Sequence, residues 1–181
     1  MTAEGADTIL RMSVSKKRGG QIGRFGVGVK SVLAICDAPQ FFSTFGEDEL
    51  FAFGFDREWS ARRIRAVQAD AVHTPVLRMA RPLDVDDERT DDPVLDEMLT
   101  WATTVVRLPL KDGAAERLAR DLRSFPVEFP LFSPHVGTVT LSDRRRARVD
   151  RQFFLRREGV AHTLQEETPN GDTVQHHWRV F

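Results

Sequence analysis

The spacing of apolar and polar residues divides the chain into a mixed first part and a strand-rich last part. Residues 6–14 have the composition of a short helix, and the apolar run over residues 30–36 predicts a buried helix directly after a glycine-rich stretch. Further runs between turn signals are predicted to be strands: residues 40–43, 50–55, 62–67 and 101–110. The acidic stretch 84–93 interrupts this pattern and is predicted to be a solvated loop.

A helix over residues 113–124 is predicted after the last of these strands. Asp112 can cap its N-terminus, and Glu116 lies in its first turn, where a carboxylate is favourable. Leu118 and Leu122 are four residues apart and therefore share one face, which is expected to be buried.

Beyond Pro134 the pattern predicts an antiparallel meander of four strands. These strands are residues 136–142, 146–156, 159–166 and 172–181. The pair Asn170-Gly171 accepts the positive φ angles that a tight hairpin needs. The last strand reaches Phe181 with no turn after it, so we expect the chain to be cut there.

Composition and charge argue against several classes of partner. The 181 residues, 41% hydrophobic and 29% charged, are enough to bury a core, and a net charge of −1 gives no general attraction for nucleic acid or membranes. No apolar run approaches the roughly 20 residues that span a bilayer, and the N-terminus lacks the apolar core of a signal peptide. A single cysteine, Cys36, fits a reducing compartment, so we expect a cytoplasmic protein.

The stretch 22–37, IGRFGVGVKSVLAICD, carries the clearest candidate chemistry. Gly23, Gly26 and Gly28 precede the predicted apolar helix. Glycines let backbone N–H groups approach an anion closely, and a helix N-terminus adds positive partial charge. From the residues alone, a phosphate-binding loop and a merely structural turn are equally good interpretations.

Two well-known phosphate motifs do not fit this stretch. A Walker A loop needs glycine, lysine and a hydroxyl residue in direct succession, whereas Val29 separates Gly28 from Lys30. A dinucleotide-binding fingerprint needs a third glycine at the position of Ser31 and a strand before the first glycine. The preceding residues 15–21, SKKRGGQ, do not have the pattern of a strand.

The same stretch resembles the second glycine box of the GHKL (Bergerat-fold) ATPase superfamily in its heat-shock-chaperone branch. Seven residues match that box in place: Ile22, Gly23, Phe25, Gly26, Val27, Gly28 and Ser31. The continuation through Lys30, Asp37 and Pro39 is most similar to sacsin-type ATP-binding domains, in which a strand begins near Ser43. Upstream, Ser15 and Lys16 resemble the pair that leads into the family's nucleotide lid.

A second match lies in residues 103–111, TTVVRLPLK. It resembles the strand in which these families place a Gly-Thr pair before an apolar L-x-L, and Thr104 falls on the threonine that contacts the nucleotide. Thr103 replaces the usual glycine. Together the two matches imply a phosphate-binding set, and this set is Gly23, Arg24, Phe25, Gly26, Val27, Gly28, Val29 and Thr104, with Ser15 and Lys16 in the lid.

The family also uses residues that are not found ahead of the lid in this sequence. A glutamate activates water, an asparagine holds Mg²⁺, and the aspartate of an Asp-x-Gly turn binds adenine. Residues 1–14 contain no asparagine, and Thr-Ile follows Asp7. We therefore assign no catalytic residue and expect Mg²⁺ only in a complete parent domain. We expect this chain to be an internal piece of a longer protein that binds nucleotide weakly at best, which micromolar affinity for ATP would contradict.

The resemblance implies both a fold and a function for this chain. The expected fold is a two-layer α/β sandwich with a mixed, mostly antiparallel sheet and helices on one face, incomplete at its N-terminus. Residues 1–133 would form the partial ATP-binding domain and residues 134–181 would begin a β-rich segment. The expected function is the ATP-binding module of a chaperone-like ATPase that acts on client or partner proteins. The alternative is a non-catalytic remnant or interaction domain that keeps the fold without ATP.

Other candidate sites have simpler interpretations. A basic cluster could contact nucleic acid, although a solvated face balanced by the acidic stretch fits the net charge better; its members are Arg144, Arg145, Arg146, Arg148, Arg151, Arg156 and Arg157. His176 and His177 are neighbours in a predicted strand and would point to opposite faces, which argues against a shared metal ion. Cys36 lies in an apolar run and is expected to be a buried, inert thiol.

Overall fold

A computed structural model describes residues 31–45, 49–74, 79–133, 135–145, 149–168 and 170–181. The glycine-rich stretch 22–29 and the pair Ser15-Lys16 lie outside these residues. The chain divides into two compact units, Met1–Asp112 and Gly113–Phe181, which are described separately. This division falls earlier in the sequence than the predicted domain boundary at 133/134. That boundary was drawn from the family resemblance, and it stays a prediction.

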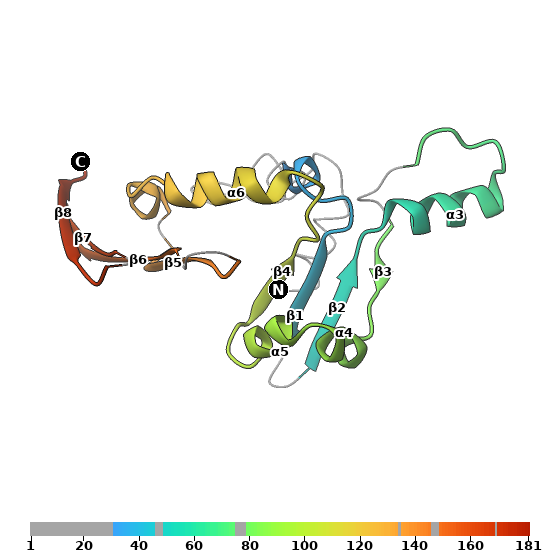
Figure 1. The fold of residues 1–181 in the computed structure, drawn as a ribbon, viewed down its shortest axis with the longest axis horizontal. Coiled ribbons are helices and arrows are strands. Elements are labelled where there is room, and N and C mark those ends of the chain that lie inside the picture. Colours follow the sequence, from blue (N-terminus) through green and yellow to red (C-terminus); the bar gives the residue numbers. More distant parts are fainter. Residues whose placement is uncertain (1–30, 46–48, 75–78, 134, 146–148, 169) are drawn as a thin grey trace. The chain divides into compact units, whose positions relative to one another are not determined.

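The first unit is built on a four-stranded antiparallel sheet. Its elements are η1 (Val32–Ala34), β1 (Gln40–Phe45), β2 (Glu49–Gly54), α3 (Arg57–Val67), β3 (Arg81–Pro82), α4 (Val85–Asp91), α5 (Pro93–Leu99) and β4 (Thr104–Arg107). The strand order is β3-β2-β1-β4, and every pairing is antiparallel (Figure 1). The predicted strands 40–43 and 50–55 are confirmed with small shifts at their ends, whereas only the middle of the predicted strand 101–110 is a strand, β4.

Each face of this sheet buries aromatic side chains. On one face Phe42 is fully buried in a cluster with Leu83, Leu95 and Val105, so α5 covers this face. On the other face the rings of Phe41, Phe53 and Phe55 pack together, with the Phe41 and Phe53 rings stacked at 5.2 Å. The alternation of side chains along a strand places neighbours such as Phe41 and Phe42 on opposite faces.

Two segments of the first unit differ from the sequence prediction. Residues 62–67 are helical as part of α3, because the Asp56 carboxylate caps the helix by accepting from the Trp59 N–H at 2.8 Å. The acidic stretch forms α4 and the start of α5. Asp84 and Asp92 cap these two helices, and a carboxylate at a helix N-terminus is stabilising. The acidic residues thus begin helices and do not form the solvated loop that was predicted.

The run 30–36 was predicted to be a buried helix. In its described part Ser31 is helical and is followed by the 3₁₀ turn η1, in which no residue is buried. Cys36, just beyond this turn, is fully buried.

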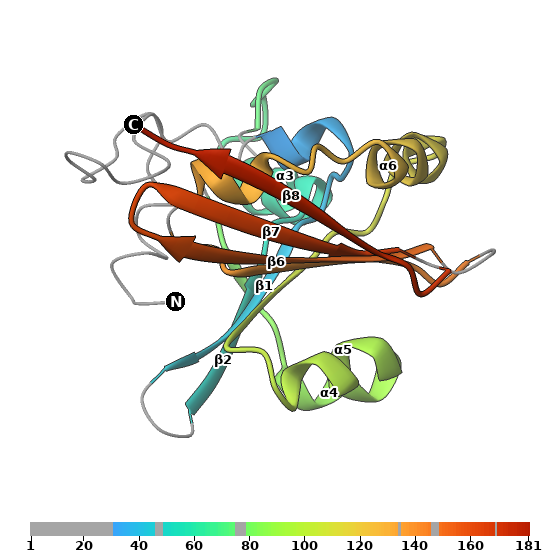
Figure 2. The ribbon, with the colours of Figure 1, turned by 90° about the vertical axis from the view of Figure 1, so that its left-hand side faces the viewer.

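The second unit consists of helical turns and a meander, as the sequence predicts. Its elements are α6 (Ala114–Arg123), η3 (Phe129–Phe132), β5 (Thr138–Asp143), β6 (Val149–Glu158), β7 (Ala161–Glu167) and β8 (Thr173–Arg179). The strands are antiparallel in the order β5-β6-β7-β8, and β6, β7 and β8 lie side by side in Figure 2. Gly171 has φ 82° in the β7–β8 hairpin, as the Asn170-Gly171 pair predicts.

The core of the second unit lies on one face of this sheet. Leu141, Phe153 and Leu164 are buried there, and Leu122 of α6 packs against them. The predicted cap of α6 is wrong. Gly113, in the left-handed conformation with φ 74°, occupies the N-cap position with no side-chain cap, so Asp112 lies one residue too early.

The described part of the chain is therefore mixed α/β, with two four-stranded antiparallel sheets. The expectation of helices combined with mostly antiparallel strands is confirmed. In the first unit α5 covers one face of the sheet, as a two-layer arrangement requires.

Candidate functional site

The segment that directly follows the glycine-rich stretch pairs with the chain beyond β4. Cys36 forms an isolated antiparallel bridge with Leu110, and the Lys111 N–H donates to the Ile35 carbonyl at 2.9 Å. The Lys111 ammonium also donates to the Leu33 carbonyl at 2.6 Å. The chain just after the first match and the end of the second match are therefore hydrogen-bonded to each other in the first unit.

Thr104, the predicted nucleotide contact, begins β4 and lies opposite Ser43 of β1. The Thr104 and Ser43 hydroxyl oxygens are 2.8 Å apart. The Ser43 hydroxyl donates to the Thr103 carbonyl at 3.1 Å, so Thr104 is the donor between the two hydroxyls. Thr104 itself is exposed and shares its sheet face with Ser43 and Phe41, opposite to the face that α5 covers.

Ser43 is the residue of this pair that sequence reasoning did not assign to the site. Its side chain is completely buried although serine is usually exposed. A buried hydroxyl needs a partner, and Ser43 finds two on the β4 side. Three of the six residues of β1, QFFSTF, are polar, so the sequence carries no signal that Ser43 would be the buried one.

The hydroxyl pair gives a prediction about stability. We expect Ser43→Ala to cost about 1 kcal/mol, because it removes a buried hydrogen-bonding group, and Thr104→Val to cost less because Thr104 is exposed. The double variant should cost less than the sum of the two by about 0.5 kcal/mol, measured by urea unfolding. Strictly additive costs would show that the two hydroxyls do not interact.

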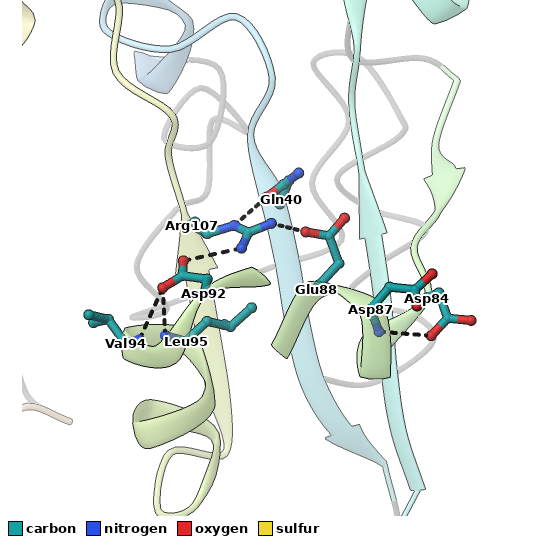
Figure 3. A network of polar contacts seen from close by, with 8 residues as sticks. All are labelled: Gln40, Asp84, Asp87, Glu88, Asp92, Val94, Leu95 and Arg107. Carbon is teal, nitrogen blue, oxygen red and sulfur yellow. Dashed lines mark hydrogen bonds and ion pairs between the residues drawn. The ribbon is translucent and has the colours of Figure 1, made fainter. Parts of the chain in front are cut away.

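The opposite face carries a polar network centred on Arg107 of β4 (Figure 3). Its guanidinium donates to the Gln40 amide oxygen at 2.5 Å, to the Asp92 carboxylate at 3.2 Å, and to the Glu88 carboxylate. The same group lies 5.4 Å from the centre of the Phe42 ring. Arg107 thus ties α4 and the start of α5 to β1 and β4, and its donors are directed at these partners.

The same network lowers the pKa of the Asp92 carboxyl. Burial alone would raise the pKa of this carboxyl, but hydrogen bonds from the Leu95 N–H, from Arg107 and from the Val94 N–H together lower it below the ordinary value of 3.8. Asp92 is therefore the N-cap of α5 and an ion-pair partner at once. We interpret the network as structural, because every one of these contacts is made within the unit.

Two members of the basic cluster in the second unit also serve the fold. Arg151 pairs with Glu166 at 2.8 Å, and both side chains are largely buried. Its other contacts are to the backbone carbonyls of Leu122, Arg123 and Phe125, and those of Arg157 are to the carbonyls of Pro130, Ser133 and Val136. Arg151 therefore does not lie on the solvated face that was predicted, and in the described part of the chain neither arginine is paired with the acidic stretch; their donors are directed at groups of their own unit.

The remaining candidates have ordinary environments. His176 faces Glu166 at 3.6 Å and His177 faces Thr163 at 3.2 Å, so the neighbouring histidines point to opposite faces of the sheet as predicted. Among the described residues, no group of three or more potential metal ligands occurs. Burial raises the pKa of the Cys36 thiol, which makes it the inert residue that was expected. No helix in the described part of the chain has the length and apolarity to cross a membrane.

Comparison with known proteins gives no further identification. No family model, curated protein sequence or solved structure matches the chain.

Proposed function

We propose that this chain is the phosphate-binding part of an ATP-binding module of the chaperone-like GHKL type. The observation that carries the proposal is the run Ile22–Ser31, which matches the family's second glycine box at seven positions. Thr104, the residue of the second match, supports it by lying next to the buried Ser43 on a sheet face that α5 does not cover. In this proposal the sheet of the first unit is part of a Bergerat-type sandwich.

The chemistry of the proposal concerns the phosphates alone. Backbone N–H groups of Gly23, Gly26 and Gly28 would hold the phosphate oxygens, supported by the following helical turn. The Thr104 hydroxyl, 2.8 Å from that of Ser43 and on the sheet face that α5 does not cover, would be the side-chain contact to the nucleotide or its bound water. No residue is assigned to the base or to hydrolysis, so binding should follow the phosphate chain and not the base.

This leads to a test with four ligands on the full 181-residue chain. We expect ATP, GTP and inorganic tripolyphosphate to bind with similar dissociation constants on the order of 1 mM, about −4 kcal/mol, while adenosine does not bind. Ligand titrations followed by ¹H–¹⁵N NMR measure affinities in this range. ATP turnover, measured as phosphate release, should stay at the background rate.

Matched glycine variants separate specific from general binding. Gly26→Val places a side chain in the glycine box and should abolish the response to tripolyphosphate. Gly137→Ala is the control, because a methyl group there would meet no atom within 4 Å and should change nothing. Thr104→Val should weaken ATP binding by a few-fold.

The alternative function, a remnant or interaction domain without ATP, predicts different results. It predicts a folded wild-type protein with no response to any of the four ligands up to about ten times the expected dissociation constant. Equal binding of adenosine and ATP would also contradict the phosphate-led proposal.

A further inference from the structure

The helix α5 and the turn after it carry an apolar stripe that is partly to largely exposed. Val94, Met98 and Trp101 are 45%, 37% and 73% exposed. Their spacing of four and three residues places them on one side of a helix. The helical turn continues past the end of α5, since the Ala102 N–H donates to the Met98 carbonyl at 2.9 Å, so Trp101 stays in line with the other two.

This stripe lies next to the buried side of the same helix, one residue along the chain and so about 100° around the helix. Leu95, next to Val94 in sequence, is only 2% exposed and belongs to the core beneath the sheet, and Leu99 packs against the same cluster. The helix therefore already has the apolar side that its own unit needs. A second apolar side that includes a largely exposed tryptophan is the kind of surface that marks an interaction site.

The segment that carries the stripe, together with the adjoining α4, is rich in negative charge. Residues 84–101 contain eight carboxylates and one arginine. Four of the carboxylates act within the fold as helix caps or ion-pair partners: Asp84, Glu88, Asp92 and Asp96. Asp86, Asp87 and Asp91 are exposed on α4, which packs against α5 (Figure 2).

We propose that this stripe, made of Val94, Met98 and Trp101 in an acidic segment, docks a basic amphipathic helix of a partner protein. The apolar residues match the i, i+4, i+7 contacts of helix-to-helix recognition, and the carboxylates select a partner whose apolar side is flanked by lysine or arginine. The same charge repels nucleic acid and anionic membrane. The inference does not depend on nucleotide binding.

A designed peptide tests the proposal on the full chain. The probe is a fluorescein-labelled helix of about 18 residues, with leucine at i, i+3, i+4 and i+7 spacing and lysine elsewhere. By fluorescence anisotropy at low salt we expect a dissociation constant on the order of 10 μM. Trp101→Ser should weaken binding about tenfold, and the double variant Asp87→Asn, Asp91→Asn should weaken it several-fold and reduce its salt dependence.

Controls make each outcome decisive. Phe132→Ser removes an aromatic side chain that is 79% exposed elsewhere in the chain and should leave binding unchanged. A scrambled peptide of the same composition, and one with glutamate in place of lysine, should not bind.

Equal affinity of wild type and Trp101→Ser would overturn the proposal. It would also be overturned if the peptide-free wild type is a dimer that Trp101→Ser converts to a monomer, because the occupant would then be a second copy of this chain. The thermal unfolding midpoint should be the same for wild type and Trp101→Ser, since the tryptophan is exposed.

Discussion

Replacing Phe153 by alanine is expected to destabilise the second unit by about 4 kcal/mol. Phe153 lies in the central part of β6, has no exposed surface and forms the core with Leu141 and Leu164. The Phe125 ring lies 6.1 Å from its ring, and the Arg151 guanidinium lies 4.9 Å from the ring centre. The substitution would therefore leave a cavity and remove the surface on which a buried ion pair rests.

The next residue in the same strand provides the matched control. Phe154 points to the opposite face and is 37% exposed, so Phe154→Ala should cost about 1 kcal/mol or less. Urea unfolding followed by Trp178 fluorescence, with Trp59 and Trp101 replaced by phenylalanine, reports on the second unit alone. Similar costs for the two variants would show that β6 does not bury the face described here.

Replacing Arg107 by methionine is expected to destabilise the first unit by about 3 kcal/mol. Its side chain is 22% exposed, and its main ion-pair partner Glu88 is 21% exposed. Removing Arg107 leaves the carboxylates of this largely buried network without a compensating charge. The loss in unfolding free energy is therefore larger than the net stabilisation that the intact network provides. Arg57→Met is the control: Arg57 pairs with Asp37 at 3.5 Å with both side chains at least half exposed, and this loss should cost less than about 0.5 kcal/mol.

Two further measurements separate charge from packing at Arg107. Adding Glu88→Gln and Asp92→Asn to Arg107→Met should recover part of the lost stability, because no uncompensated carboxylate then remains. The pKa of Asp92 is lowered in the folded protein, so its contribution is present above the ordinary value of 3.8 and is lost as the pH falls through the lower folded value. The difference in unfolding free energy between wild type and Arg107→Met should therefore narrow below pH 3.8. A difference that does not change with pH would contradict this role of Asp92.

Strands were predicted more reliably than helices because their patterns are local. The strands at Gln40–Phe45 and in the C-terminal meander contain phenylalanine, leucine, valine or threonine, and turn residues such as Asn170-Gly171 bound them. The helix α3 has few apolar residues, and its arginines obscure the periodicity. Its start depends on Asp56, one capping residue outside the stretch that was interpreted as a strand.

The acidic stretch 84–93 is a second case in which local composition did not predict helices. Its carboxylates are typical of a solvated loop, and their composition alone gives no indication that two of them cap helices. That role follows from their positions relative to Val85 and Pro93, where α4 and α5 begin. The partner Arg107 is 15 residues beyond Asp92 and reaches it only because β4 packs beneath the helices.

In the candidate site, one residue was assigned from the sequence and its partner was found only in the structure. Thr104 was assigned from the order of residues in one strand. Its partner Ser43 is 61 residues away in sequence, and only the β1–β4 register brings the two hydroxyls together. No property of either residue alone specifies such a pairing, because strand register depends on the side chains of both strands and on the core between them.

The sequence by itself determined the strand-rich character of the chain, the order of the C-terminal meander, the burial of Cys36 and the glycine-rich stretch that motivates the nucleotide proposal. These features depend on residues that are neighbours along the chain. Only the tertiary structure decided that Arg107 clamps two acidic helices, that Ser43 supports Thr104, and that Val94, Met98 and Trp101 stay exposed while Leu95 is buried. The physical reason is that burial and pairing of side chains depend on which distant segments the sheet brings together.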